Sequence, residues 1–326
     1  MSGAWERFGW AGTEVPSAPL DDQERRRLDL PRTLRPVAGD GVTQRPVFDP
    51  ALKHFSNAYR AADPGFGDPV RDAAWRVARR EALHVVLAAI ADSQWVDSLV
   101  LRGSVLLADW FGEAAREPGD LDFVVTPADW HIGQGRTERM LDGIATAAQR
   151  TAERLGTGLS VSASGAVSED IWAYDRVPGR RMVLPWSAPG LPAGQVQLDF
   201  VFNERLPLDP GPTEVAGAVL LAATPELSLA WKVMWLVSDM HPQGKDLYDA
   251  VLLAERYPLR YQLLDEVFRL VEADPYPGRP VEAGDVEEIG RYVEWEHFRT
   301  EYPHVPGDGQ DYAARLVAAL ASTFAS

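Results

Sequence analysis

The segment LRGSVLLADWFGEAAREPGDLDFVV, residues 101–125, is the most informative part of the sequence about the fold class. It begins inside a predicted β-strand over 95–102, which the Gly-Ser pair at 103–104 ends, and residues 105–111 then have helical character. A second strand is predicted over 120–125, where acidic and apolar residues alternate. Strand, turn, helix and strand in this order indicate an α/β (α+β) fold.

The chain around this stretch divides into three predicted parts. Residues 1–68 are rich in proline and show little periodicity, which predicts an extended N-terminal arm. Residues 69–222 are expected to form a mixed sheet with flanking helices, and residues 223–326 an all-helical C-terminal half. The expected elements of the middle part are helices over 69–93 and 136–155, two or three strands within 159–186, and a strand over 195–202. The expected helices of the last part are 226–238, 245–255, 261–272, 286–300 and 312–324.

Composition excludes several classes of protein. The formal net charge of -16 argues against binding duplex DNA over a broad surface, because phosphate contacts need positive charge. The absence of cysteine excludes disulfides, thiolate metal sites and a cysteine nucleophile. No stretch reads as a secretory signal or as a membrane span, so we expect no membrane partner and a cytoplasmic location.

Paired acids in the strand DLDFVV are the first candidate for chemistry. Side chains alternate along a strand, so Asp120 and Asp122 share one face while Leu121 and Phe123 share the other. Two like charges this close favour a bound cation, and hard oxygen ligands suit Mg²⁺. A solvent-facing edge strand with two harmless aspartates is the alternative interpretation.

Two further features point the same way. Asp199 in QVQLDFVF (195–202) also lies opposite apolar neighbours, and a third acid could complete a two-metal site. Gly103 and Ser104 stand where a strand turns into a helix, so Ser104 could cap that helix while backbone N–H groups face a phosphate. The alternatives are a polar position on an amphipathic strand and an ordinary capped helix.

In this order and spacing, the motifs over about 70–256 resemble the nucleotidyltransferase superfamily, and more narrowly the AbiEii/AbiGii toxin family. In that family an arginine usually stands four residues before the first aspartate, as Arg116 does here. The family also has a helix with an internal lysine and then a Lys-Asp pair that opens another helix. The segment ELSLAWKVMWLVSDMHPQGKDLYDAVLLAE (226–255) supplies Lys232, Lys245 and Asp246, with Asp249 one turn further on.

The resemblance implies a role for each matched residue. Asp120, Asp122 and Asp199 would ligate Mg²⁺ or Mn²⁺, with Asp199 also facing the attacking hydroxyl. The remaining matched residues would bind the nucleotide: Gly103 and Ser104 at the β- and γ-phosphates, Arg116, Lys232 and Lys245 as cations, and Asp246 as a partner of Lys245 or of the acceptor. The alternatives are a lysine at 232 that reaches solvent along its aliphatic stem, and a surface pair at 245–246.

The implied activity is transfer of a nucleoside monophosphate from an NTP such as ATP, GTP or CTP to an acceptor hydroxyl, with release of pyrophosphate. The resemblance implies the 3′ end of an RNA such as tRNA as acceptor, and an antitoxin protein as partner. Because the chain is acidic, a second interpretation is a small-molecule acceptor, as in biosynthetic or antibiotic-modifying enzymes. A third is a non-catalytic nucleotide-binding or interaction protein that keeps the fold.

Overall fold

The computed structural model describes residues 21–56, 58–174, 177–271 and 280–325, and the chain forms two compact units. Unit 1 takes the residues up to Leu101 together with Pro118–Asn203 and Pro212–Leu221; unit 2 takes Arg102–Glu117, Glu204–Gly211 and the residues from Ala222 on. The stretch 101–125 therefore contributes to both units. Among the described residues, no helix is long and apolar enough to cross a membrane.

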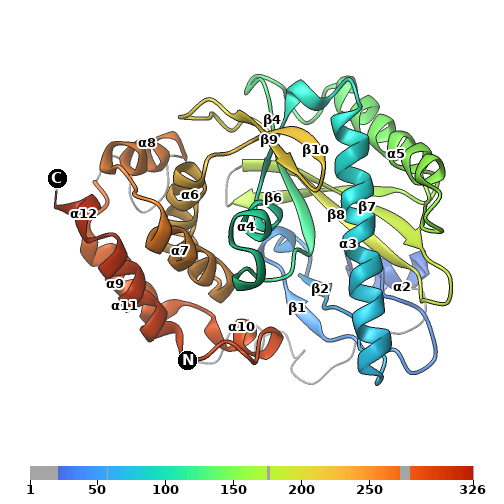
Figure 1. Cartoon of the computed structure of the whole chain (residues 1–326), viewed down its shortest axis with the longest axis horizontal. Coiled ribbons are helices and arrows are strands. Elements are labelled where there is room, and N and C mark those ends of the chain that lie inside the picture. Colours follow the sequence, from blue (N-terminus) through green and yellow to red (C-terminus); the bar gives the residue numbers. More distant parts are fainter. Residues whose placement is uncertain (1–20, 57, 175–176, 272–279, 326) are drawn as a thin grey trace. The chain divides into compact units, whose positions relative to one another are not determined.

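A mixed sheet forms the centre of unit 1 (Figure 1). Its order is β5-β7-β8-β4-β3-β10-β9, and β6 also pairs with β7. Strand β4 is parallel to β8, while β7 is antiparallel to β5, β6 and β8. The strands are β3 (Leu99–Arg102), β4 (Asp120–Val125), β5 (Ser160–Val161), β6 (Val167–Tyr174), β7 (Val177–Ser187), β8 (Gly194–Val201), β9 (Gly211–Val215) and β10 (Ala218–Ala222). The predicted mixed α/β class is confirmed.

Helix α3 (Pro69–Ala91) packs on the sheet and against α5 (Gly135–Leu155), and Figure 1 shows α3 crossing in front of β7 and β8. The helix is held to the strands by aromatic contact, since the rings of Trp75 and Trp186 lie 5.4 Å apart between centroids. A Cβ at Gly194 would lie 2.5 Å from the Trp186 ring, so this close approach requires glycine. Both tryptophans are buried in this contact.

The N-terminal segment, residues 21–68, has secondary structure of its own, whereas residues 1–20 of the predicted arm lie outside the described part of the chain. Its elements are α2 (Asp22–Arg27), β1 (Pro46–Phe48), the 3₁₀ helix η1 (Pro50–Leu52) and β2 (Tyr59–Ala61), with β1 antiparallel to β2. It buries apolar side chains against Ile171 of β6, namely Leu30, Leu34, Phe48, Leu52, Ala58 and Tyr59. The carboxylate of Glu169, also on β6, accepts from the backbone N–H groups of Arg32 and Thr33 at 2.8 and 2.9 Å.

The described part of unit 2 consists mainly of helices. In its described part α7 packs against α6, α10 and α11, and α11 also packs against α9 (Figure 1). The helices are α4 (Ser104–Phe111), α6 (Pro225–Ser238), α7 (Gly244–Arg256), α8 (Tyr261–Val271), α9 (Ala283–Tyr292), α10 (Trp295–Glu301), α11 (Gly309–Ala319) and α12 (Ala321–Phe324). The helix predicted over 286–300 is thus two helices. Backbone pairing divides them, because the N–H of Glu294 donates to the carbonyl of Pro242 at 2.8 Å.

One helix and one hairpin differ from the prediction for reasons that lie in capping and turn chemistry. The helix expected over 312–324 is the two helices α11 and α12, and α11 begins at Gly309, because Asp308 caps it and accepts from the N–H groups of Gln310 and Asp311. The hairpin of β9 and β10 was not expected. Its turn residues Ala216 and Gly217 both have positive φ, 51° and 79°, which is the geometry of a two-residue hairpin turn.

Candidate functional site

The predicted acids of unit 1 come together on two neighbouring strands. Within β4, Leu121 and Phe123 are fully buried, while Asp120 and Asp122 alternate with them toward the other, half-buried face. Strand β8 runs parallel to β4 in a register that places Asp199 beside Asp122. The three acids therefore share one face of the sheet, and we call them the carboxylate group.

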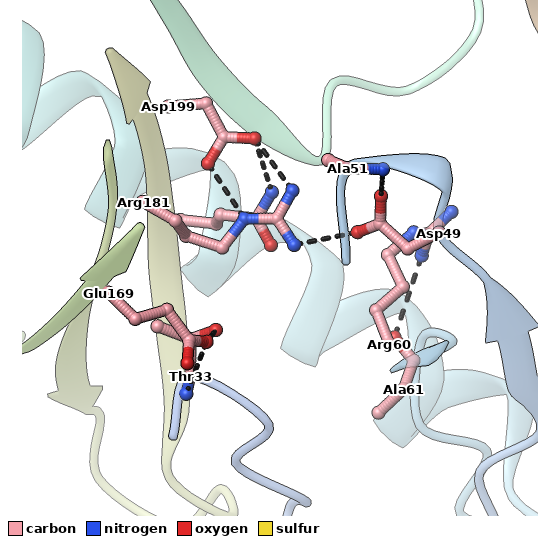
Figure 2. Close-up of polar contacts among 9 residues, drawn as sticks. Thr33, Asp49, Ala51, Arg60, Ala61, Glu169, Arg181 and Asp199 are labelled. Carbon is pink, nitrogen blue, oxygen red and sulfur yellow. Dashed lines mark hydrogen bonds and ion pairs between the residues drawn. The ribbon is translucent and has the colours of Figure 1, made fainter. Parts of the chain in front are cut away.

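An arginine that the sequence did not single out lies next to this group (Figure 2). Arg181 of β7 stands directly opposite Asp199 in the antiparallel ladder. Its Nε and Nη2 donate to the two oxygens of Asp199 at 2.8 and 2.7 Å, and its Nη1 donates to Asp49 at 2.6 Å. The carboxylate of Asp49 also accepts from the N–H of Ala51, which it caps at the start of η1. Arg181 is thus clamped between two aspartates that lie far apart in the sequence.

Burial and charge act in opposite directions on this cluster. Burial raises the pKa of Asp199, the Arg181 guanidinium opposes that effect, and the nearby carboxylates of Asp120 and Asp49 raise the pKa further, so that it lies above its ordinary value. Burial by itself lowers the pKa of Arg181, but its two aspartate partners outweigh burial and raise it well above the usual value. Arg181 therefore keeps its positive charge in spite of its burial.

The carboxylate group is not a preformed metal cage. Within the described ranges, no group of three or more histidine, aspartate or glutamate side chains could hold a metal ion as it stands. Both oxygens of Asp199 accept hydrogen bonds from Arg181. Mg²⁺ is often held by one or two carboxylates together with the phosphates of a substrate. Asp120 and Asp122, as hard oxygen donors on one face, fit that chemistry.

The Gly-Ser turn lies between β3 and α4. Gly103 has φ 87° and ψ -155°, a region that only glycine occupies without strain, and it stands at the N-cap of α4. Ser104 was expected to cap this helix, but Gly103 occupies the N-cap position and Ser104 is the first residue of the helix. The N-terminal N–H groups of α4 are the kind of donors that bind an anion.

The residue before this turn is fixed by partners that the sequence did not reveal. Arg102 is buried, and its Nη1 contacts both carboxylate oxygens of Glu204, at 3.1 and 2.9 Å. Its guanidinium also lies 5.1 and 5.3 Å from the ring centroids of Trp231 and Trp235 on α6. These contacts hold the strand end from which the Gly103 turn departs.

Three predicted residues of unit 2 meet around a fourth, Asp249 of α7, which is fully buried. Arg116 donates to Asp249 through Nε at 3.0 Å and Nη2 at 2.9 Å. Lys232 of α6 contacts Asp246 at 2.6 Å and Asp249 at 3.1 Å. We call these four residues the lysine–aspartate group. The alternatives of a solvent-reaching lysine and a surface pair at 245–246 are wrong for Lys232 and Asp246, which are bonded to each other with side chains 6% and 15% exposed.

The two carboxylates keep Lys232 charged inside the protein. Burial by itself lowers the pKa of Lys232, but Asp246 and Asp249 outweigh burial and raise it above its usual value. Burial raises the pKa of Asp246, yet Lys232 and then Lys245 lower it by more, so the net shift is downward. Asp246 was expected to partner Lys245, whereas its hydrogen bond goes to Lys232. The positive charge of Lys245 helps to lower the pKa of Asp246.

Sequence reasoning missed Arg181, Asp49 and the hub role of Asp249. Asp249 follows Asp246 by three positions on one helix, so the shared face could have been deduced from spacing. Arg181 stands in RRMVLPW, where a charged residue in a largely apolar strand signals a buried partner. No local signal identifies Asp49, which lies 132 positions from Arg181.

Comparisons with known proteins agree with the resemblance seen in the motifs. The family model described as "Nucleotidyl transferase AbiEii toxin, Type IV TA system" matches residues 85–319. No curated protein matches. Among solved structures, the crystal structure of an antigenic nucleotidyltransferase-like protein from Paracoccidioides brasiliensis is similar at 14% identity and a TM-score of 0.34, covering 60% of this chain and 89% of that chain.

Proposed function

The chain belongs to the AbiEii family of nucleotidyl transferase toxins, and from this premise we propose that it moves a nucleoside monophosphate from an NTP to an acceptor hydroxyl in a reaction that depends on Mg²⁺ or Mn²⁺. The matched residues, 85–319, contain both the carboxylate group and the lysine–aspartate group. The observation that carries the proposal is the carboxylate group itself, in which Asp122 and Asp199 stand side by side on parallel strands with Asp120 on the same face. Three acids in this arrangement are typical of cation-assisted phosphoryl chemistry.

The carboxylate group would serve the reacting end of the nucleotide. Asp120 and Asp122 would hold the divalent cation, with Asp199 as a third acid beside them; when bound, such a cation neutralises phosphate charge and lowers the pKa of the attacking hydroxyl. The acceptor oxygen forms a bond to the α-phosphorus, the bond from that phosphorus to the bridging oxygen breaks, and pyrophosphate leaves. The proton of the hydroxyl passes to solvent.

The family resemblance assigns the Gly-Ser turn and the lysine–aspartate group, both in unit 2, to the phosphates of the nucleotide. Gly103 has no side chain, so the β- and γ-phosphates could approach the N–H groups at the start of α4, beside Ser104. Lys232, held charged by Asp246, would offset the negative charge that builds on pyrophosphate, and Lys245 would add to it. Arg116 would act through Asp249, to which it is bonded.

Two classes of acceptor are candidates for this reaction. Membership in a toxin family of type IV toxin–antitoxin systems favours an RNA such as tRNA as acceptor and an antitoxin as partner, in the cytoplasm where NTPs and tRNA occur together. The net charge of -16 favours the second candidate, a small-molecule hydroxyl acceptor, because capture of RNA draws on positive surface charge. Both candidates share the same transfer chemistry.

The test is transfer of label from each of four α-³²P NTPs to bulk tRNA in the presence of Mg²⁺. The wild-type chain is run beside Asp120→Ala/Asp122→Ala, and beside Asp170→Ala as a matched control on the exposed side of β6. Label that enters tRNA with the wild type and the control, but not with the double variant, supports the RNA acceptor and names the base. Mg²⁺-dependent NTP binding without label in tRNA supports the small-molecule acceptor, and absence of NTP binding contradicts the proposal.

A further inference from the structure

Asp199, the acid expected as the third metal ligand, is already paired with an arginine side chain. Arg181 covers both oxygens of Asp199, through Nε at 2.8 Å and Nη2 at 2.7 Å, and the amide of Gln197 reaches the second oxygen at 3.2 Å. A planar guanidinium on both oxygens of a carboxylate is the strongest form of this pairing. A metal ion that used Asp199 would have to share it with this arginine or displace it.

Arg181 is not positioned to swing away. Its side chain is 4% exposed, and its remaining terminal nitrogen, Nη1, is held by Asp49 at 2.6 Å. Asp49 is itself fixed, because it caps η1 within the N-terminal segment. That segment is anchored to β6 by the apolar cluster around Ile171 and by Glu169. Asp49 and the rest of this segment precede the residues that the family model matches, 85–319, whereas Glu169, Ile171 and Arg181 lie within them.

The charges of Arg181 and of the carboxylate group determine how a cation would bind here. The carboxylate group alone would place three like charges on one face, and Arg181 neutralises the one at Asp199 permanently. A free divalent cation approaching Asp122 and Asp199 meets that fixed positive charge. A cation that is already bound to a triphosphate is repelled less by Arg181, because the phosphate oxygens reduce its net charge. They also supply the ligands that Asp199 does not.

Building on the proposed function, we propose that Arg181 is a positioning residue that serves as the internal counter-cation of Asp199, so that the carboxylate group binds free divalent cations weakly and takes its cation as the complex with an NTP. The order of binding follows from this, with the cation and the nucleotide arriving together. Asp49 supports the arrangement by holding Arg181 from the other side.

Calorimetric titration of MnCl₂ into the full chain without nucleotide tests the proposal. The decisive variant is Arg181→Gln/Asp49→Asn, which removes one positive and one negative charge together and so leaves the net charge unchanged. We expect it to bind Mn²⁺ at least about tenfold more tightly than the wild type, and Arg181→Lys, which keeps the charge but cannot cover both oxygens, to lie between them. A merely structural role of Arg181 would loosen Mn²⁺ binding instead.

Arg180→Gln is the matched control, since Arg180 is the neighbouring residue on β7 and pairs with Asp170 and Glu138 rather than with the carboxylate group. It should bind Mn²⁺ as the wild type does. Circular dichroism and thermal melting establish that each variant is folded, and if the double variant does not fold, Arg181→Lys alone decides by the direction of its change. Unchanged or weaker Mn²⁺ binding in the folded variants overturns the proposal.

A second titration separates this inference from the proposed function. Mn²⁺ together with a non-hydrolysable NTP analogue should bind the wild type, and Asp120→Asn/Asp122→Asn should abolish that binding. If that double variant binds the complex like the wild type, the metal role of the carboxylate group fails. If instead only the Arg181 variants behave otherwise than expected, the counter-cation role fails while the proposed function stands.

Discussion

Arg116 holds the fully buried carboxylate of Asp249 through two nitrogens, Nε at 3.0 Å and Nη2 at 2.9 Å, across 133 positions of the sequence. The same carboxylate contacts Lys232 at 3.1 Å. One acid thus compensates two buried cations, and a buried charge that loses its partner is costly. The stability of unit 2 therefore depends on a residue that also organises its candidate site.

Replacing Asp249 should test that dependence. We expect Asp249→Asn to lower the free energy of unfolding by about 3–5 kcal/mol, because Arg116 loses its carboxylate and Lys232 keeps only Asp246. Glu255→Gln on the same helix is the control, since its pair with Arg315 is exposed and such pairs contribute about 0–1 kcal/mol. Urea denaturation measures both changes. A loss for Asp249→Asn no larger than that of the control would contradict the hub role.

The pair of Lys232 and Asp246 should give unit 2 a defined pH dependence. The pKa of Lys232 is raised, so its contribution is complete below 10.5 and declines as the pH rises through the higher value of the folded state. The pKa of Asp246 is lowered, so its contribution is complete above 3.8 and declines as the pH falls through the lower value of the folded state. The stability difference between the wild type and Lys232→Met/Asp246→Leu should stay constant between these limits and decrease outside them. Denaturation curves over a pH series measure it, and a change centred near neutral pH would assign the coupling to other groups.

The Gly103 turn should tolerate no side chain. Gly103→Ala places a Cβ at φ 87° and should cost about 1–3 kcal/mol of stability, together with a loss of NTP binding if phosphates approach this backbone. Gly284→Ala is the control, because Gly284 lies in α9 at negative φ with open space around it, and alanine favours a helix. Thermal melting and NTP titration give the two readouts. Equal effects of both substitutions would remove the special role of the turn.

Asp122→Asn should separate chemistry from folding. The change preserves shape but removes a charge beside Asp199, and loss of a metal-binding carboxylate should lower kcat by about a hundredfold or more. The melting temperature should not fall, because one of three like charges disappears. Single-turnover label transfer measures the rate, with Asp170→Asn as the exposed control on β6. Full activity in Asp122→Asn would exclude the carboxylate group from catalysis.

The alternation of polar and apolar residues, together with proline, glycine and capping residues, made much of the fold predictable from local sequence. The strand over 120–125 is β4 residue for residue, and the buried side of its pattern holds Leu121 and Phe123 as expected. Proline, glycine and capping residues indicated the helix boundaries. The start of α11 at Gly309, after its cap Asp308, and the hairpin turn at 216–217 were missed because those signals were misread. The predicted acids on β4 and β8 do share one face.

Three features can be deduced from the spacing of near neighbours in the chain: the alternation that places Asp120, Asp122 and Asp199 on polar faces, the glycine at the strand end, and the family to which these motifs point. The charge partners follow from the folded structure alone: Arg181 between Asp199 and Asp49, and Asp249 between Arg116 and Lys232. These pairs join residues that strand order and helix packing bring together from distant positions. Burial then makes each pairing obligatory, since an ion removed from water requires a counter-ion at contact distance, and no local pattern specifies which one it will be.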